Sequence, residues 1–147
     1  MAQGKDIRHA VDGAPSGRRG KHRVAVERQV GRQDRPGKAV MGGAGFGHAL
    51  LATTPEALAE QQPWRHDETG CLVVSDSRLD NRPQLLRALG IERPADQVGD
   101  GELLHAAWHR WGEDLPDHLR GDFAFAIWSP RQGELFLARD PMGVRPL

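Results

Sequence analysis

The C-terminal part of the chain, residues 121–147, is the feature that most constrains the fold. It reads GDFAFAIW, then the short break SPRQG, then ELFLARDPMGVRPL. Apolar side chains fill successive positions in residues 123–128 and again in residues 135–138, and the break between them contains Pro130 and Gly133. Because neighbouring strand residues point to opposite faces, a strand that is apolar on both faces needs a layer on each. The pattern therefore predicts an antiparallel hairpin buried between two layers.

Charge divides the chain into two unlike pieces. The whole sequence is balanced, with 20 basic and 20 acidic residues, but residues 1–40 hold ten lysines and arginines against four acids. All the tryptophans and phenylalanines follow residue 45. A segment without large aromatic residues builds little core, so we expect residues 1–40 to be basic and disordered, with a hint of strand only at 24–26. Residues 41–147 are then expected to form one domain.

Several partners and locations can be weighed from composition. The arginines of residues 1–40 follow no helical period and no aromatic residues lie among them to stack on bases, so a solvated tail is preferred over a nucleic-acid-binding arm. No apolar run is long enough to cross a membrane, and the N-terminus lacks the apolar core of a secretory signal. Because Cys71 is the single cysteine, no internal disulfide can form, which favours a cytoplasmic location.

Short strand-like and helical runs alternate between the basic segment and the hairpin. Strands are predicted near residues 44–52 and 71–75, and helices near residues 82–89 and 101–111. Together with the hairpin, this mixture predicts an α+β domain.

Local signals mark the ends of the two helices. Asn81 is expected to cap the first helix, Pro83 suits its first turn, and Gly90 should end it. Asp100 or Gly101 is expected to cap the second helix.

Two other chemistries receive little support from the sequence. His105 and His109 lie four residues apart on the second helix, but no further ligand spacing completes a metal site, so no metal is predicted. Cys71 lies in an apolar strand without an evident base, so we interpret it as a core residue and not as a nucleophile.

The hairpin and its continuation carry a resemblance to a known family. GDFAFAIW followed by ELFLARDPMGVRPL, together with GAGFGH at residues 43–48 and Gln-Pro-Trp at residues 62–64, resembles the class II (N-terminal nucleophile) glutamine amidotransferase domain of asparagine synthetase-like proteins. The resemblance implies an Ntn-hydrolase-like four-layer αββα sandwich of antiparallel sheets, incomplete here at its N-terminus and therefore of marginal stability. It also implies a glutamine-hydrolysing, ATP-dependent amide-forming enzyme, whose ATP and Mg²⁺ belong to a synthetase domain or chain that would be a separate partner, so no cofactor is expected in this chain.

The resemblance also indicates site residues, and most of the residues that active relatives use for catalysis and substrate binding are replaced in this chain. Active relatives carry Asn-Gly-Glu where this chain has Asp76, Ser77 and Arg78, and an ionised aspartate cannot donate to an oxyanion. The slot of the arginine that holds the substrate carboxylate is Ala49 or Leu50.

Other positions complete this comparison with the family. Asp100 matches the aspartate that receives the substrate's amino group, although a plain helix cap is the preferred interpretation of it. Position 2 is Ala2, where active relatives carry cysteine after the initiator Met. We therefore expect no catalytic residue, and a vestigial substrate site made of Asp100, Asp76 and Ser77.

Three functional hypotheses follow from these comparisons. The first is a glutaminase-inactive scaffold domain or gene fragment, because residues 79–82 resemble the nucleophile-lacking lasso-peptide cyclases and β-lactam synthetases. The second is an active glutaminase that supplies ammonia to a separate synthetase for asparagine biosynthesis, and the third is an interaction module that uses the basic tail. We also expect residues 1–40 to derive from a shifted reading frame or a wrong start, which translating the other frames would test.

Overall fold

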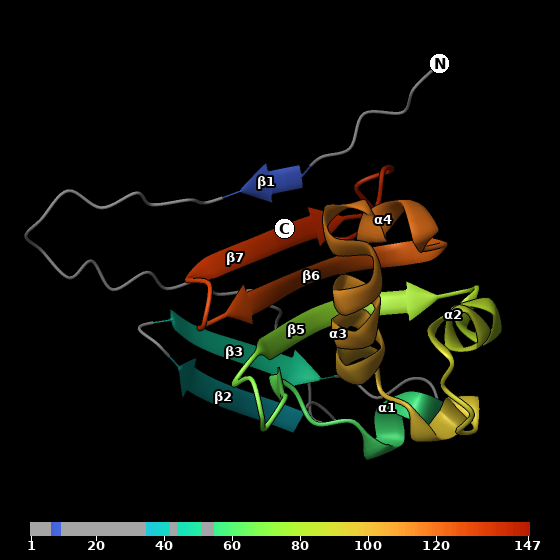
Figure 1. Cartoon of the computed structure of the whole chain (residues 1–147), viewed down its shortest axis with the longest axis horizontal. Helices are drawn as coiled ribbons and strands as arrows, with labels where there is room; N and C mark the ends of the chain where they lie inside the picture. The colour runs from blue at the N-terminus through green and yellow to red at the C-terminus, as the bar shows by residue number, and fades with distance from the viewer. Residues whose placement is uncertain (1–6, 10–34, 42–43, 51–54) are drawn as a thin grey trace, which may run out of the picture.

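The computed structural model describes residues 7–9, 35–41, 44–50 and 55–147 (Figure 1). The strands are β1 (Ile7–His9), β2 (Arg35–Met41), β3 (Ala44–Leu50), β4 (Trp64–Arg65), β5 (Leu72–Leu79), β6 (Gly121–Ser129) and β7 (Glu134–Arg139). The helices are α1 (Pro55–Ala59), α2 (Arg82–Leu89), α3 (Asp100–Trp111) and α4 (Leu115–His118), with 3-10 turns at Ala95–Gln97 and Gly112–Asp114.

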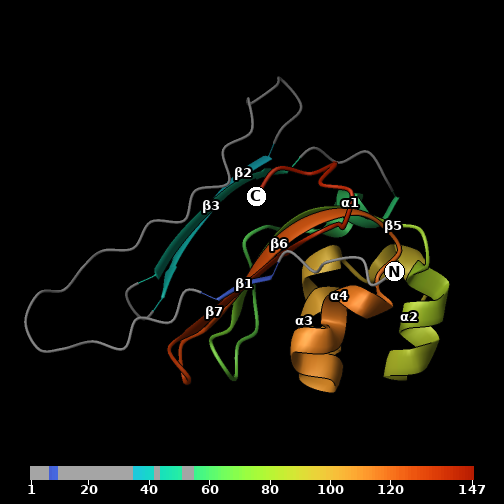
Figure 2. The same cartoon turned by 90° about the horizontal axis from the view of Figure 1, so that it is seen from above.

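The strands form two antiparallel sheets. One has five strands in the order β1-β7-β6-β5-β4, and the other is the β2–β3 hairpin. Helices α2, α3 and α4 cover one face of the larger sheet, and β2–β3 lies over its other face (Figure 2). An α+β fold is thereby confirmed. Among the residues that the structure describes, no helix covers the face of β2–β3 that points away from the larger sheet. No helix in this part of the chain is long and apolar enough to span a bilayer.

The predicted C-terminal hairpin is confirmed as the centre of the larger sheet. Strand β6 pairs with β7 from Ala124 opposite Arg139 to Ser129 opposite Glu134, and its other edge pairs with all of β5. Residues 123–127 of β6 are all buried. The apolar pattern on both faces therefore reflects a layer on each face, as strand alternation requires.

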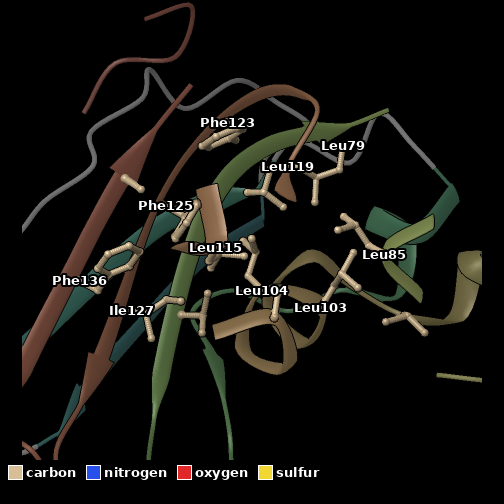
Figure 3. Packing of buried hydrophobic residues seen from close by; sticks show 14 of the residues in the cluster. Leu79, Leu85, Leu103, Leu104, Leu115, Leu119, Phe123, Phe125, Ile127 and Phe136 are labelled. Atoms are coloured by element: carbon tan, nitrogen blue, oxygen red, sulfur yellow. The ribbon is translucent and has the colours of Figure 1, made fainter. Parts of the chain in front are cut away.

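The larger core lies between the sheet and the helices (Figure 3). It joins apolar side chains of α2, α3 and α4 to those of β5, β6 and β7; those labelled in the figure are Leu79, Leu85, Leu103, Leu104, Leu115, Leu119, Phe123, Phe125, Ile127 and Phe136. Cys71 belongs to this cluster and is 4% exposed, which confirms its prediction as a core residue.

A smaller core fills the space between the two sheets. Its buried members are Phe46, Leu72, Val74 and Ala126, and partly buried residues of β2, β3, β6 and β7 surround them. Along β5, Leu72 and Val74 thus face β2–β3, whereas Val73 faces the helices. This alternation decides on which face each later residue of β5 lies.

The first forty residues contain more structure than the sequence predicts. The expectation of disorder is wrong for Ile7–His9, which pairs with β7, and for Arg35–Met41, which pairs with β3 over seven residues and crosses the expected boundary at residue 40. Gly37 packs so closely on Gln62 that an added Cβ would lie 1.7 Å from its carbonyl oxygen. The pairing of Ile7–His9 with β7 and the packing of Gly37 on Gln62 join residues far apart in the sequence, and β2 itself carries no apolar period that would predict a strand. The possible strand at 24–26 lies outside the described residues.

The caps of α2 differ from the predictions in one respect. Gly90 ends α2 at φ 68°, and Pro83 lies in its first turn, as expected. Asn81 occupies the N-cap position, but its side chain makes no cap hydrogen bond. It donates instead to the His118 carbonyl at 2.9 Å and accepts from the Arg120 N–H at 2.9 Å. The Asn81 side chain therefore hydrogen bonds to the backbone at the end of α4 and not to the N–H groups of its own helix.

Candidate functional site

Asp100, the first residue of α3, lies against β5. Ser77 lies on the same face of the strand as Val73 and therefore faces the helices, and it donates its hydroxyl to Asp100 Oδ2 at 2.7 Å. The structure therefore brings together two of the three site residues nominated by the sequence. The preferred interpretation of Asp100 as a helix cap is wrong, since α3 has Gly99 at its N-cap and no side-chain cap bond from Asp100.

Arg82, the first residue of α2, fills the remaining side of Asp100. Its side chain is 6% exposed, and Nη2 donates to Asp100 Oδ1 in a buried ion pair. Nη1 donates to the Val98 carbonyl at 2.6 Å, and Nε lies 3.4 Å from Glu56 Oε1 in α1. Burial lowers the pKa of Arg82, while the charges of Glu56 and Glu60 oppose that effect. An arginine starts from so high a pKa that it stays charged here.

The N-terminus of α3 is capped by Glu60, which was not among the site residues predicted from the sequence. Glu60 is 5% exposed, and its Oε1 accepts the Gly101 N–H at 2.7 Å and a weaker bond from Gln62 Nε2 at 3.3 Å. Gln62 also donates to Ser75 Oγ at 3.0 Å and accepts the Ser75 N–H at 2.7 Å. Burial raises the pKa of Glu60, although the Gly101 hydrogen bond and Arg82 oppose the rise. A carboxylate at this position complements the helix dipole.

Asp76, the third nominated residue, belongs to the opposite face of β5. It lies on the same face of the strand as Leu72 and Val74, which face β2–β3, so it points away from the Ser77–Asp100 pair. Its Oδ2 accepts from Arg145 Nη1 at 3.3 Å, with both side chains about three-quarters buried. The carboxylate of Asp76 is therefore part of a contact that holds the C-terminal residues to the sheet.

Asp140 fixes the same C-terminal residues. It is 2% exposed and accepts the N–H groups of Val144 at 2.9 Å, Arg145 at 3.1 Å and Phe123 at 3.3 Å. Burial alone would raise the pKa of Asp140, but these backbone donors outweigh it and hold the pKa below its ordinary value. Asp140 thus joins β6 to the residues after β7 through these hydrogen bonds.

A group of histidine rings lies between α3 and the residue that follows β4. His105 is 7% exposed; its Nε2 lies 3.1 Å from Nε2 of His109, and its ring stacks on His66 at a centroid distance of 4.5 Å. Burial, followed by the charges of His109 and His66, lowers the pKa of His105 to about 4. Within the described ranges, no three metal-ligating side chains are placed to hold a metal ion.

The chemistry available at Asp100 is limited by its existing partners. Ser77 donates to one carboxylate oxygen and Arg82 to the other, so an incoming ammonium group would meet a carboxylate that is already neutralised and hydrogen bonded. Sequence reasoning did not select Arg82 as a site residue. One local signal was present, because a cation at the first position of a helix opposes the helix dipole and needs an acidic partner from elsewhere.

Comparisons with known proteins agree on one kind of domain. A family model described as a glutamine amidotransferase domain matches residues 48–147. Asparagine synthetase (glutamine-hydrolysing) 3 of Bacillus subtilis is 36% identical over 106 residues, covering 69% of this chain and 17% of the relative. A putative asparagine synthetase of Mycobacterium tuberculosis is 53% identical over 49 residues, covering 33% of this chain and 8% of the relative. The amidase chry2 of Gibberella zeae is 28% identical over 103 residues, covering 70% of this chain and 15% of the relative. The chain thus matches less than a fifth of the length of each of these relatives.

Proposed function

This chain belongs to the glutamine amidotransferase domain family of asparagine synthetase-like proteins, and from that premise we propose that it is a glutaminase-inactive member that acts as a scaffold. The observation that carries the proposal is the occupation of both carboxylate oxygens of Asp100 by groups of the chain itself. Glutamine would have to bring its ammonium group to a carboxylate that is already neutralised and hydrogen bonded.

Displacing the resident partner would be costly. Arg82 is buried, and removing one partner of a buried ion pair typically costs about 3–5 kcal/mol because the other charge is left unpaired. An ammonium group that replaced Arg82 would therefore have to overcome this cost before it gained any net binding.

The position aligned with the oxyanion donor supports the same proposal. Stabilising an oxyanion requires hydrogen-bond donors aimed at the developing charge. Asp76 is a carboxylate paired with Arg145, and it faces away from Asp100 across β5. It supplies an acceptor and a negative charge on the wrong face.

The cysteine that the sequence contains does not replace the missing chemistry. Cys71 is buried in the helix-side core, and burial raises the pKa of its thiol to about 11. A thiol with this pKa is almost wholly protonated at neutral pH and has no access to solvent, so it is a poor nucleophile.

The scaffold would serve a synthetase part, either in the same polypeptide or as a separate chain, as the synthetase names of the relatives suggest. ATP and Mg²⁺ would belong to that part. A fourth, helical layer over β2–β3 would complete the proposed Ntn-type sandwich. The cytoplasmic location remains a prediction from the sequence.

Ammonia release from L-glutamine tests the proposal directly. Purified protein is incubated with glutamine beside an Asp100→Asn variant and an active glutaminase, and the expected rate equals the buffer background for both forms of this chain. Covalent labelling by a glutamine-mimicking electrophile should likewise be absent. Ammonia release that the Asp100→Asn substitution abolishes would overturn the proposal in favour of an active glutaminase.

A further inference from the structure

We infer that the pocket at Asp100 is a guanidinium-binding site, which the chain fills with its own Arg82. This inference rests on the proposed function only in treating Asp100 as the position where relatives receive an amino group. It assigns the pocket a different ligand class and an occupant from within the chain.

Oxygens from α1, from α3 and from Val98 just before α3 surround one planar cation. Nη2 of Arg82 meets the Asp100 carboxylate at the start of α3, Nη1 meets the Val98 carbonyl just before α3, and Nε lies 3.4 Å from the Glu56 carboxylate in α1. Nη1 and Nη2 thus donate to two oxygens near the start of α3, whereas Nε makes no hydrogen bond and lies beside the Glu56 carboxylate of α1 as its ion-pair partner. A guanidinium can present its nitrogens to all three oxygens at once, whereas a compact ammonium group would reach only some of them.

Charge and burial favour the same ligand. Val98 is fully buried and Arg82 is 5% exposed, so the acceptors are largely withdrawn from water. Without the guanidinium, the carboxylates of Asp100 and Glu56 would face each other across a vacated space, with the buried Glu60 carboxyl near enough to interact electrostatically with both Arg82 and Glu56. A cation is required there, and a weakly hydrated guanidinium loses less on leaving water than an ammonium does.

The position of Arg82 explains how the pocket is closed. Arg82 begins α2, and its neighbour Pro83 occupies the first turn of the helix at the exposed surface. The bound side chain therefore ties α1, α2 and α3 together at one point. In this chain the former amino-group position works as a structural joint between helices.

Chemical rescue tests the inference. Arg82→Ala should empty the pocket and lower the folding equilibrium constant at least 100-fold, as expected for removing one member of a buried pair. Methylguanidinium at millimolar concentration should then raise the thermal midpoint of Arg82→Ala saturably, with at least tenfold weaker half-saturation for methylammonium. Wild-type protein should not respond, because Arg82 occupies the site. Arg87→Ala removes an exposed arginine of the same helix and is the matched control, with no rescue expected.

A second measurement covers the case in which Arg82→Ala does not fold. Refolding yield is then measured with and without methylguanidinium, and recovery in its presence alone supports the inference. Equal rescue by both cations, rescue of Arg87→Ala, or failure of methylguanidinium to act on either midpoint or yield would overturn it. Ammonia release from glutamine bears on the proposed function alone, so the two failures are distinguishable.

Discussion

Acidification should weaken this fold through His105. The ordinary pKa of a histidine side chain is 6.5, and burial beside His109 and His66 lowers that of His105 to about 4. Between these values the unfolded chain binds a proton that the folded chain does not. The stabilising contribution is therefore fully present above pH 6.5 and is lost as the pH falls towards 4.

The size of this effect follows from the two pKa values. One pKa unit corresponds to 1.36 kcal/mol, so the full difference of about 2.5 units is worth about 3 kcal/mol. At pH 5 the expected loss relative to pH 7.5 is about 2 kcal/mol, because the pH has then fallen only part of the way from the unfolded-state pKa to the folded-state pKa. Because His105 is 7% exposed, solvent screening does little to reduce this value.

The assay is urea unfolding of the wild type and of His105→Leu at pH 7.5, 6.0 and 5.0. Glu60 works in the opposite direction, since its raised pKa makes the folded state bind more protons as the pH falls below that value. Both proteins carry Glu60, so its effect cancels in the difference between their free energies of unfolding. That difference should shift by about 2 kcal/mol in favour of the variant between pH 7.5 and 5.0. Two stability profiles that remain parallel would refute the reasoning.

Three further substitutions or treatments have definite expected outcomes. Gly101→Ala should lower the thermal midpoint, although alanine ordinarily favours a helix by about 1 kcal/mol, because the added Cβ would lie 2.3 Å from Cβ of Trp64; an unchanged or higher midpoint would contradict this contact. Asp140→Asn should cost about 1–3 kcal/mol in urea unfolding at pH 7, since charged acceptance of three backbone N–H groups is lost, and the cost should shrink in acid as the wild-type carboxylate itself is protonated. Cys71 should resist alkylation by iodoacetamide at pH 8 and react once urea unfolds the chain, and mass spectrometry would expose a reactive native thiol.

The secondary structure of residues 71–139 was largely predictable because its signals are local. The buried hairpin follows from apolar positions on both faces of residues 123–128, and Gly90 ends α2 through a left-handed conformation that glycine adopts easily. Strand β2 was missed because its seven residues carry no period that distinguishes it from a loop. It becomes a strand by pairing with β3.

Two members of the candidate site, Asp100 and Ser77, were predicted from the sequence, whereas Arg82, Glu60 and the contacts they make were not. The resemblance selected Asp100, Ser77 and Asp76, and the alternation of β5 then separates Asp76 from the other two. Glu60, which caps α3 from 41 residues away, left no mark at the helix itself. Such contacts depend on how α1 and β4 return to the start of α3.

The sequence by itself determined the α+β class, the central hairpin and the family, because period, turn chemistry and motif are properties of neighbouring residues. Only the tertiary structure decided that Arg82 neutralises Asp100 and that Asp76 pairs with Arg145. Arg82 and Asp100 are 18 residues apart and Asp76 and Arg145 are 69 apart, so each pairing is set by the packing of separate elements on one sheet.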